Sequence, residues 1–290
     1  MTTSNDSVAD RIQDNFERLT RAERQLAGAL RENYPVSGLG SITTLAENAQ
    51  VSTPTVVRMV RKLGFAGFPE FQAALKRELE AKISNPIAKH ESWAENAPDE
   101  HPLNQFTEAV IDNIHQSLAQ VDHEVFDRAC GLLADPSRQV FIVGGRISRS
   151  LSDYFYMHLQ MIRAGVHPIN AANNNWPHSI LDMKAEDVLV AIDMRRYENS
   201  TIKMAELAQE RGVRLILFTD QWGSPVSKFA DMSFSSKISV PSAWDSLVVT
   251  LLLMETMVAD VQRRSWNNTR NRIEELEEIF DRTRQFRKFT

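Results

Sequence analysis

The sequence predicts two domains of different fold class joined by a linker. Apolar residues recur at helical spacing up to residue 83, whereas short, continuous apolar runs alternate with helical segments after residue 138. Between these regions, residues 84–102 contain three prolines and no sustained apolar period, as is typical of a linker. With 290 residues, 42% of them apolar, the chain is long enough for two cores. We therefore predict an all-α domain over residues 1–83 and an α/β domain with a parallel sheet over residues 103–290.

Two helices are predicted at the start of the all-α domain. Residues 8–19 carry apolar side chains on one helical face, which indicates an amphipathic helix. Thr20 followed by Glu23 has the form of a capping box, so a second helix should begin there and run to Asn33. Pro35 then prevents that helix from continuing.

A hairpin of two short helices is predicted over residues 41–67. The apolar period is interrupted at Val51 and then resumes, which indicates a tight turn between the two helices. We expect the hydroxyl of Ser52 to cap the second helix, and Pro54 falls in its first turn, where a missing backbone N–H costs little. Residues 69–83 are predicted to form a further helix that packs beneath the hairpin.

The solvent face of the second hairpin helix is basic and carries no acid, which suits a helix in a DNA major groove. A solvated basic face on an ordinary helical hairpin is the alternative, because such hairpins also occur in enzymes and scaffolds. The DNA-binding residues that we predict are Ser52, Thr53, Thr55, Arg58, Arg61 and Lys62.

The segment LAENAQVSTPTVVRMVRKLGFAGFPEFQAALKREL resembles the N-terminal domain of the RpiR family of bacterial transcriptional regulators. The phrase VSTPTVVRMVRKLGFAGFPEF is quite specific to that family. The resemblance implies a helix-turn-helix domain that binds double-stranded operator DNA. A single helix-turn-helix contacts few base pairs, so we expect at least a homodimer on a two-fold related operator. We expect the dimer interface to consist of the long apolar helix over 243–266 and the amphipathic tail helix over 267–290, along with exposed helices of the sheet domain.

The second half of the chain is predicted to form a parallel sheet covered by helices on both faces, because nearly continuous apolar strands alternate with helices. Helices are expected over 103–121, 124–134, 148–164, 200–210, 243–266 and 267–290. Strands are expected at QVFIVGG, VHPIN, DVLVAID, RLILFTD and DMSFSS.

Two loops between a strand and a helix stand out as a candidate ligand site, because open parallel sheets bind ligands at the carboxyl ends of their strands. Arg146, Arg195 and Arg196 could converge there on a phosphate or carboxylate. Alternatively, they pair with Asp193, with Glu198 or with acids at a subunit interface. The effector-binding residues that we predict are Gly144, Gly145, Arg146, Ser148, Arg195, Arg196, Asn199 and Ser200.

Residues 104–262 resemble the sugar isomerase (SIS) domain, which in RpiR regulators senses phosphosugars and related metabolites. QVFIVGG, AEDVLVAID and AELAQERGVRLILFTDQWGSPVSKFAD carry the resemblance. It implies a flavodoxin-like α/β sandwich. The second loop of that domain usually holds a Ser-x-Ser-Gly phosphate cradle, but residues 193–196 read Asp-Met-Arg-Arg, and Arg146 stands where glycine is common. We therefore expect a small anionic effector, either a phosphosugar or a carboxylated metabolite.

Other function classes are disfavoured by composition and motifs. A net charge of −5 argues against a protein that coats nucleic acid, and no run approaches the roughly 20 apolar residues of a membrane span. The N-terminus has no signal peptide pattern, and the single Cys130 cannot form an internal disulfide, so we expect a cytoplasmic protein. G-x-G-x-x-G is missing and no His or Cys spacing resembles a metal site; we expect no cofactor.

A sugar-phosphate isomerase with an accessory helical domain is the competing function. An isomerase needs a positioned base that moves a proton next to a carbonyl. Glu198 could be proposed as that base, but no constellation singles out any carboxylate, and we predict no catalytic residues. We therefore predict a non-enzymatic regulator whose effector alters its binding to DNA.

Overall fold

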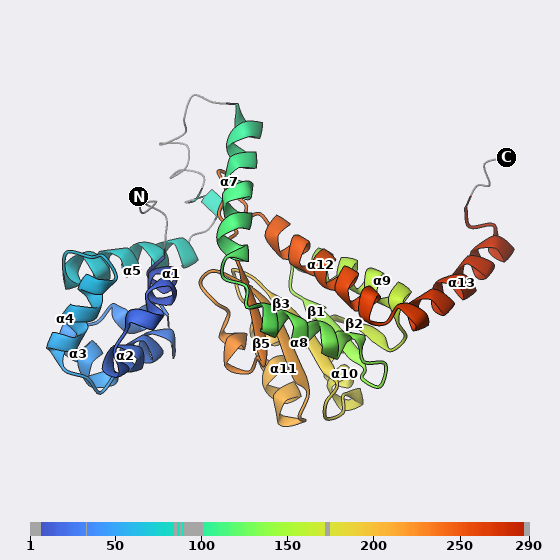
Figure 1. Cartoon of the computed structure of the whole chain (residues 1–290), viewed down its shortest axis with the longest axis horizontal. Helices are drawn as coiled ribbons and strands as arrows, with labels where there is room; N and C mark the ends of the chain where they lie inside the picture. Colours follow the sequence, from blue (N-terminus) through green and yellow to red (C-terminus); the bar gives the residue numbers. More distant parts are fainter. Residues whose placement is uncertain are drawn as a thin grey trace. The chain divides into compact units, whose positions relative to one another are not determined.

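The computed structural model describes residues 7–32, 34–83, 86, 87, 89, 101–171 and 175–286. Contacts between Cα atoms divide the chain into two compact units, residues 1–96 and 97–290, which are described separately below (Figure 1). Most of the linker predicted for residues 84–102 lies outside the described residues. Its boundaries therefore stay a prediction.

The first unit is entirely helical and follows the predicted order of elements. Its helices are α1 (Val8–Asp14), α2 (Arg21–Glu32), α3 (Ile42–Asn48), α4 (Thr53–Lys62) and α5 (Phe68–Ile83), with 3₁₀ turns at Phe16–Arg18 and Val36–Gly38. The prediction of one continuous helix over residues 8–19 was wrong, because α1 ends at Asp14. Its C-cap residue is Asn15, whose backbone amide and side-chain amide both donate to the carbonyl of Arg11, at 3.2 and 2.9 Å, and a 3₁₀ turn follows.

The core of the first unit lies between α2, α4 and α5. Buried side chains from all five helices meet there, among them Leu30, Val56, Phe71 and Leu75. Gly38 allows the chain to pass close to this core, since a Cβ at that position would lie 2.3 Å from Cδ1 of Leu75. The capping box predicted for α2 is confirmed, because the Glu23 carboxylate accepts the Thr20 amide at 2.8 Å and the Thr20 hydroxyl accepts the Glu23 amide at 3.4 Å.

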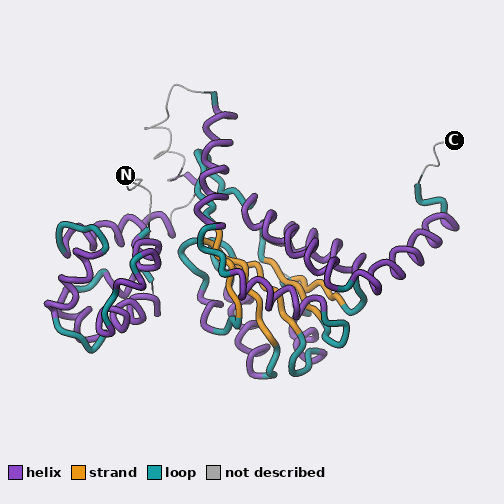
Figure 2. Tube along the Cα trace, in the orientation of Figure 1, coloured by secondary structure: helices purple, strands orange, loops and turns teal. Residues whose placement is uncertain are grey.

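The second unit is a five-stranded parallel sheet with the strand order β2-β1-β3-β4-β5, which confirms the predicted fold class. Figure 2 shows its strands in orange among the purple helices. This is the flavodoxin-like order. Its strands are β1 (Val140–Gly144), β2 (Val166–Asn170), β3 (Val188–Asp193), β4 (Arg214–Asp220) and β5 (Met232–Ser236). Its helices are α7 (Pro102–Leu118), α8 (His123–Ala134), α9 (Arg149–Ile162), α10 (Trp176–Asp182), α11 (Asn199–Glu210), α12 (Val248–Arg264) and α13 (Trp266–Thr283), with a 3₁₀ turn at Pro225–Lys228.

Separate cores cover the two faces of this sheet. In β1, Val140 and Ile142 pack with residues of α8, α9 and α12, whereas Phe141 and Val143 pack with residues of α10 and α11. The central strands β1, β3 and β4 are buried on both faces, which explains their nearly continuous apolar sequences, whereas the edge strands β2 and β5 are partly exposed. Helix α13 packs on α9. None of the described helices is long and apolar enough to cross a membrane.

The helix predicted over residues 243–266 begins later than expected, at Val248. The preceding residues form a loop over the sheet edge, because the amide of Ser246 donates to the carbonyl of Ile238 at 2.9 Å. Asp245 in that loop forms an ion pair with Arg195. These tertiary contacts compete with extension of the helix toward its amino end.

Candidate functional site

The helix-turn-helix of the first unit comprises α3, a tight turn and α4. The Val51 amide donates to the carbonyl of Ala46 at 2.9 Å, and Gln50 in the turn has a left-handed φ of 52°. Ser52 is the N-cap residue of α4 and Pro54 lies in the first turn, as predicted. The expected capping by the Ser52 hydroxyl was wrong: it lies 2.9 Å from the hydroxyl of Thr55 and makes no bond to the helix backbone.

The solvent face of α4 keeps two exposed arginines, Arg58 and Arg61, together with exposed Ser52 and half-buried Thr53. Within the described part of the chain, neither guanidinium is paired with an acid. Thr55 does not share this face; it is 5% exposed, which corrects the prediction. Its hydroxyl accepts a hydrogen bond from Nη2 of Arg58 at 3.1 Å and so restrains that side chain.

Lys62 differs from the two arginines because it is already paired. Its ammonium lies 2.6 Å from the carboxylate of Glu23 and 3.3 Å from the carbonyl of Arg18. Burial raises the pKa of Glu23, but hydrogen bonds from Lys62 and Thr20 outweigh it and hold that pKa below its ordinary value. Helical spacing alone could not find this pair, since its partners lie 39 residues apart.

In the second unit, the two predicted loops lie side by side at the carboxyl edge of the sheet. Strands β1 and β3 are neighbours although β2 lies between them in sequence, so chain connections diverge from this point of the sheet. The backbone amide of Arg146, in the loop after β1, donates to Oε1 of Glu198, in the loop after β3, at 3.0 Å. The strand order therefore brings the two predicted loops together, as their hydrogen bond shows.

Several of the predicted loop residues have structural contacts. The buried hydroxyl of Ser148 donates to the carbonyls of Gly145 at 3.0 Å and Ile192 at 2.9 Å, which ties the first loop to β3. At Gly144 a Cβ would lie 2.6 Å from the carbonyl oxygen of Ser148. The Ser200 hydroxyl is 3.4 Å from Oε2 of Glu198, whereas Asn199 is exposed.

The three arginines do not converge on one point. The side chain of Arg195 is only 7% exposed, and its guanidinium contacts the carboxylate of Asp245 at 2.7 to 3.2 Å while lying 4.9 Å from the ring centre of Trp222. A ligand-binding role for Arg195 is therefore not supported, since a buried guanidinium needs the partner that it already has. Arg146 and Arg196 are exposed. Neither guanidinium group has an acidic side-chain partner among the residues that the structure describes.

Two acids are buried at the same edge, of which Asp193 was named only as a possible partner of the arginines and Asp220 was missed. Burial raises the pKa of Asp193 to about 6, against hydrogen bonds from the hydroxyl of Ser224 and the amide of Glu198. Asp220 is also buried and accepts the hydroxyl of Tyr197 at 2.7 Å. A signal was present: the apolar runs DVLVAID and RLILFTD both end in Asp, and parallel strands end at the same edge.

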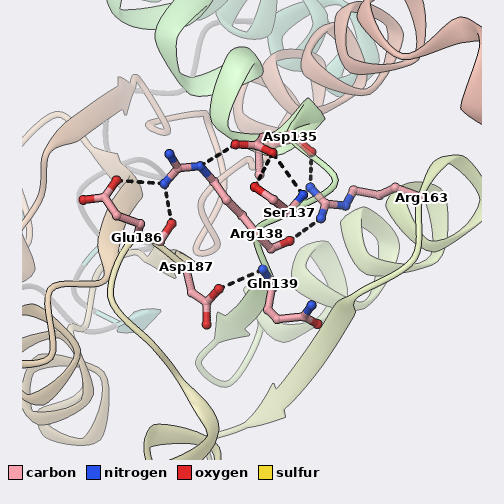
Figure 3. Close-up of polar contacts among 8 residues, drawn as sticks. Asp135, Ser137, Arg138, Gln139, Arg163, Glu186 and Asp187 are labelled. Atoms are coloured by element: carbon pink, nitrogen blue, oxygen red, sulfur yellow. Dashed lines mark hydrogen bonds and ion pairs between the residues drawn. The ribbon is translucent and has the colours of Figure 1, made fainter.

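The amino edge of the sheet holds a second group of charges (Figure 3). Arg138 bonds to Asp135 and to Glu186, both at 2.9 Å, and the buried Arg163 donates to three backbone carbonyls, including that of Leu133 at 2.5 Å. A hollow of about 460 Å³ beside them is lined by Arg128, Gly131, Leu132, Asp135, Arg138, Arg214, Asp231 and Met232. Its charges are largely matched, since Arg214 also lies 3.0 Å from Asp231. These ion pairs therefore connect the segments that lead into the strands, and we assign them a structural role.

Comparisons with known proteins match both units. Residues 7–82 match the helix-turn-helix domain of the rpiR family, and residues 132–259 match the SIS domain. The transcriptional regulator HexR of Pseudomonas aeruginosa is 24% identical over 272 residues, which cover 89% of this chain and 90% of HexR. The Vibrio vulnificus NanR protein complexed with ManNAc-6P is 20% identical with a TM-score of 0.53, over 96% of this chain and 99% of NanR.

The SIS domain of an RpiR transcription factor from Sphaerobacter thermophilus is similar to the second unit. It has a TM-score of 0.57 and 20% identity, and the match covers 61% of this chain and 98% of that domain. These structures share the fold of the sheet, and the helix-turn-helix match places the family in the first unit. The chain belongs to the RpiR family of transcriptional regulators, with an N-terminal helix-turn-helix domain and a C-terminal SIS domain.

Proposed function

We propose that this regulator binds double-stranded operator DNA through α4 and that a small anionic metabolite, bound at the carboxyl edge of the sheet, changes its affinity for that DNA. The proposal includes the domain division at residues 84–102. The observation that carries it is the exposed pair Arg58 and Arg61 on α4, which has no acidic partner among the described residues. Such guanidinium groups bind phosphates and the edges of guanine bases.

Arg58 is the residue proposed for a base contact. The Thr55 hydroxyl restrains its guanidinium at 3.1 Å, so less side-chain freedom is lost when Arg58 binds. Arg61 and Thr53 then contact the backbone of the duplex. Lys62 contributes less, because Glu23 already neutralises it.

A binding assay on the upstream region of its own operon tests this assignment. Arg58→Ala should weaken specific binding by about 1 to 3 kcal/mol, and Thr55→Val should reproduce part of that loss by releasing Arg58. Lys62→Ala is the matched control on the same helix and should change affinity less. Unchanged binding by the Arg58 variant would show that another surface contacts the DNA; an equal loss on unrelated DNA would make Arg58 a phosphate contact.

The effector is proposed to bind between the loops after β1 and β3. The similar NanR protein is complexed with ManNAc-6P. In this chain Arg146 and Arg196 are the exposed cations of the two loops, and we assign the ligand's anionic group to them. A ligand switches the protein only if it binds one arrangement of the regulator more tightly than another.

A thermal-shift screen of phosphosugars and carboxylated metabolites should identify an effector. Arg146→Ala with Arg196→Ala should then abolish the effect of that compound on DNA binding, while binding of DNA without the compound is retained. Calorimetry decides the matter, since equal affinity of parent and double variant for the compound would exclude both arginines from the site.

We also propose a homodimer, because one helix-turn-helix contacts too few base pairs for useful specificity. Large apolar side chains are exposed on the outer helices of the second unit, including Val248 on α12 and Trp266 and Ile279 on α13. An interface would cover them. Light scattering at micromolar concentration should show a dimer or a larger assembly; a monomer with and without DNA would contradict this.

A further inference from the structure

Glu198 is the N-cap residue of α11, yet its side chain does not cap that helix. The carboxylate instead reaches the neighbouring loop, where Oε1 accepts the backbone amide of Arg146 at 3.0 Å. Its other oxygen lies 3.4 Å from the hydroxyl of Ser200. A backbone N–H of the loop after β1 is therefore already hydrogen-bonded to the Glu198 carboxylate, which comes from the loop after β3.

The fold provides the space for this contact. At Gly145 a Cβ would lie 2.6 Å from both Cδ and Oε1 of Glu198, so a side chain there would displace the carboxylate from its present position. The backbone of Glu198 is held as well, because its amide donates to Oδ1 of the buried Asp193 at 3.3 Å. The position of the carboxylate is thus set from the end of β3 and from the first loop together.

A free backbone amide at this edge of a parallel sheet is where a ligand anion is ordinarily held. In this chain a carboxylate already accepts from it. A second anion brought to the same amide would face the charge of Glu198 at short range. An ionised carboxylate only accepts hydrogen bonds, so the ligand group that complements it carries a donor, such as a hydroxyl or an ammonium.

We propose that Glu198 is the specificity-determining residue of the effector site: its carboxylate occupies the anion position at the Arg146 amide, excludes phosphate or carboxylate groups from it, and selects a ligand that presents a hydroxyl or an ammonium group there. The anionic group of the ligand is then directed to the guanidinium groups of Arg146 and Arg196. This inference rests on the proposed function, because it places the effector between the same two loops.

The test is the affinity of the full chain for inorganic phosphate, measured by calorimetry. Glu198→Ala frees the Arg146 amide and removes the charge, so it should bind phosphate at least tenfold more tightly than the parent. Glu198→Gln, which keeps an acceptor but loses the charge, should fall between the two. Glu206→Ala, an equal change of net charge on the exposed part of α11, is the matched control and should bind as the parent does.

Equal phosphate affinity of the parent and the Glu198 variants, including no binding by any of them, would overturn the proposal. Glu198→Gln preserves the side-chain shape and so keeps the test usable if Glu198→Ala does not fold. The measurement involves no DNA. Tighter phosphate binding without any effect of ligands on DNA affinity would leave this inference standing and refute the proposed regulatory role of the site.

Discussion

The helix-turn-helix unit and the sheet unit each hold a cation that was expected to bind a ligand and is instead paired with a distant acid. In the first unit the pair is Lys62 with Glu23, at 2.6 Å; in the second it is Arg195 with Asp245, at 2.7 Å. The difference is burial of the cation. The side chain of Lys62 is 36% exposed, whereas that of Arg195 is 7% exposed.

Burial decides what each pair does for the protein. Lys62 can regain water when its partner is lost, whereas the side chain of Glu23 is 2% exposed, so this pair offsets part of the cost of burying the carboxylate. Arg195 cannot regain water without moving the loop after β3, so its pair holds that loop to the loop after β5. Removing the acidic partner should therefore cost less folding free energy for Lys62 than for Arg195, although both are simply basic residues in the sequence.

The largest expected effect comes from breaking the sheet-side pair. Asp245→Ala leaves the Arg195 guanidinium buried without its acid and should lower the free energy of unfolding of the second unit by about 3 to 5 kcal/mol. Denaturant unfolding measures this loss. Arg196→Ala, next to it in sequence but exposed, is the control and should change stability by less than about 0.5 kcal/mol. Similar losses for both variants would contradict the contrast drawn from burial.

A second prediction concerns the pH dependence of stability that the buried Asp193 causes. Because burial raises the folded-state pKa of Asp193 to about 6, its protonated form stabilises the fold below about pH 4, and that stability is lost as the pH rises through 6. The slope reaches about 1.4 kcal/mol per pH unit inside this window. Stability curves of the parent and Asp193→Asn should therefore diverge between pH 4 and 6. Parallel curves would show that Asp193 titrates as it does in the unfolded chain.

Glu23 should show the opposite pH dependence, on a smaller scale. Its folded-state pKa is lowered, so its contribution is present above its ordinary pKa and is lost as the pH falls through the folded value. Lys62→Gln removes one of the groups that lower the pKa of Glu23, so it should reduce this acid-side loss. The cost near neutral pH should be about 1 kcal/mol, because the carboxylate still accepts the Thr20 amide. Arg61→Gln, without an acidic partner among the described residues, is the control; a cost as large as that of Lys62→Gln would contradict the assignment.

The smallest effect concerns the turn that orients α4. Gln50 is exposed and has a φ of 52°, a conformation that costs a residue with a Cβ about 1 kcal/mol. Gln50→Gly should recover part of that energy, as seen in thermal unfolding of the full chain, and leave Lys62 and Glu23 paired. A loss of stability would mean that the glutamine side chain makes contacts that outweigh the backbone cost.

Local patterns in the sequence predicted the elements and their classes. The capping box of Thr20 and Glu23, the hairpin around Val51 and the apolar strands all follow from spacing within a few residues, where short-range hydrogen bonding and burial act. The alternation of strands and helices also restricted the sheet to a parallel topology, so that two of its loops could be named as neighbours in advance.

The partner of each charged side chain could not be deduced in this way. Glu23 meets Lys62 across 39 residues and Arg195 meets Asp245 across 50, and nothing in the local period encodes either meeting. Thr55 was predicted to be one of the DNA-binding residues, yet the packing of α4 buries it. The sequence by itself determined where cations gather on α4 and at the carboxyl edge of the sheet. Only the tertiary structure decided which of them remain exposed, because burial and the approach of a distant acid are properties of the packed chain.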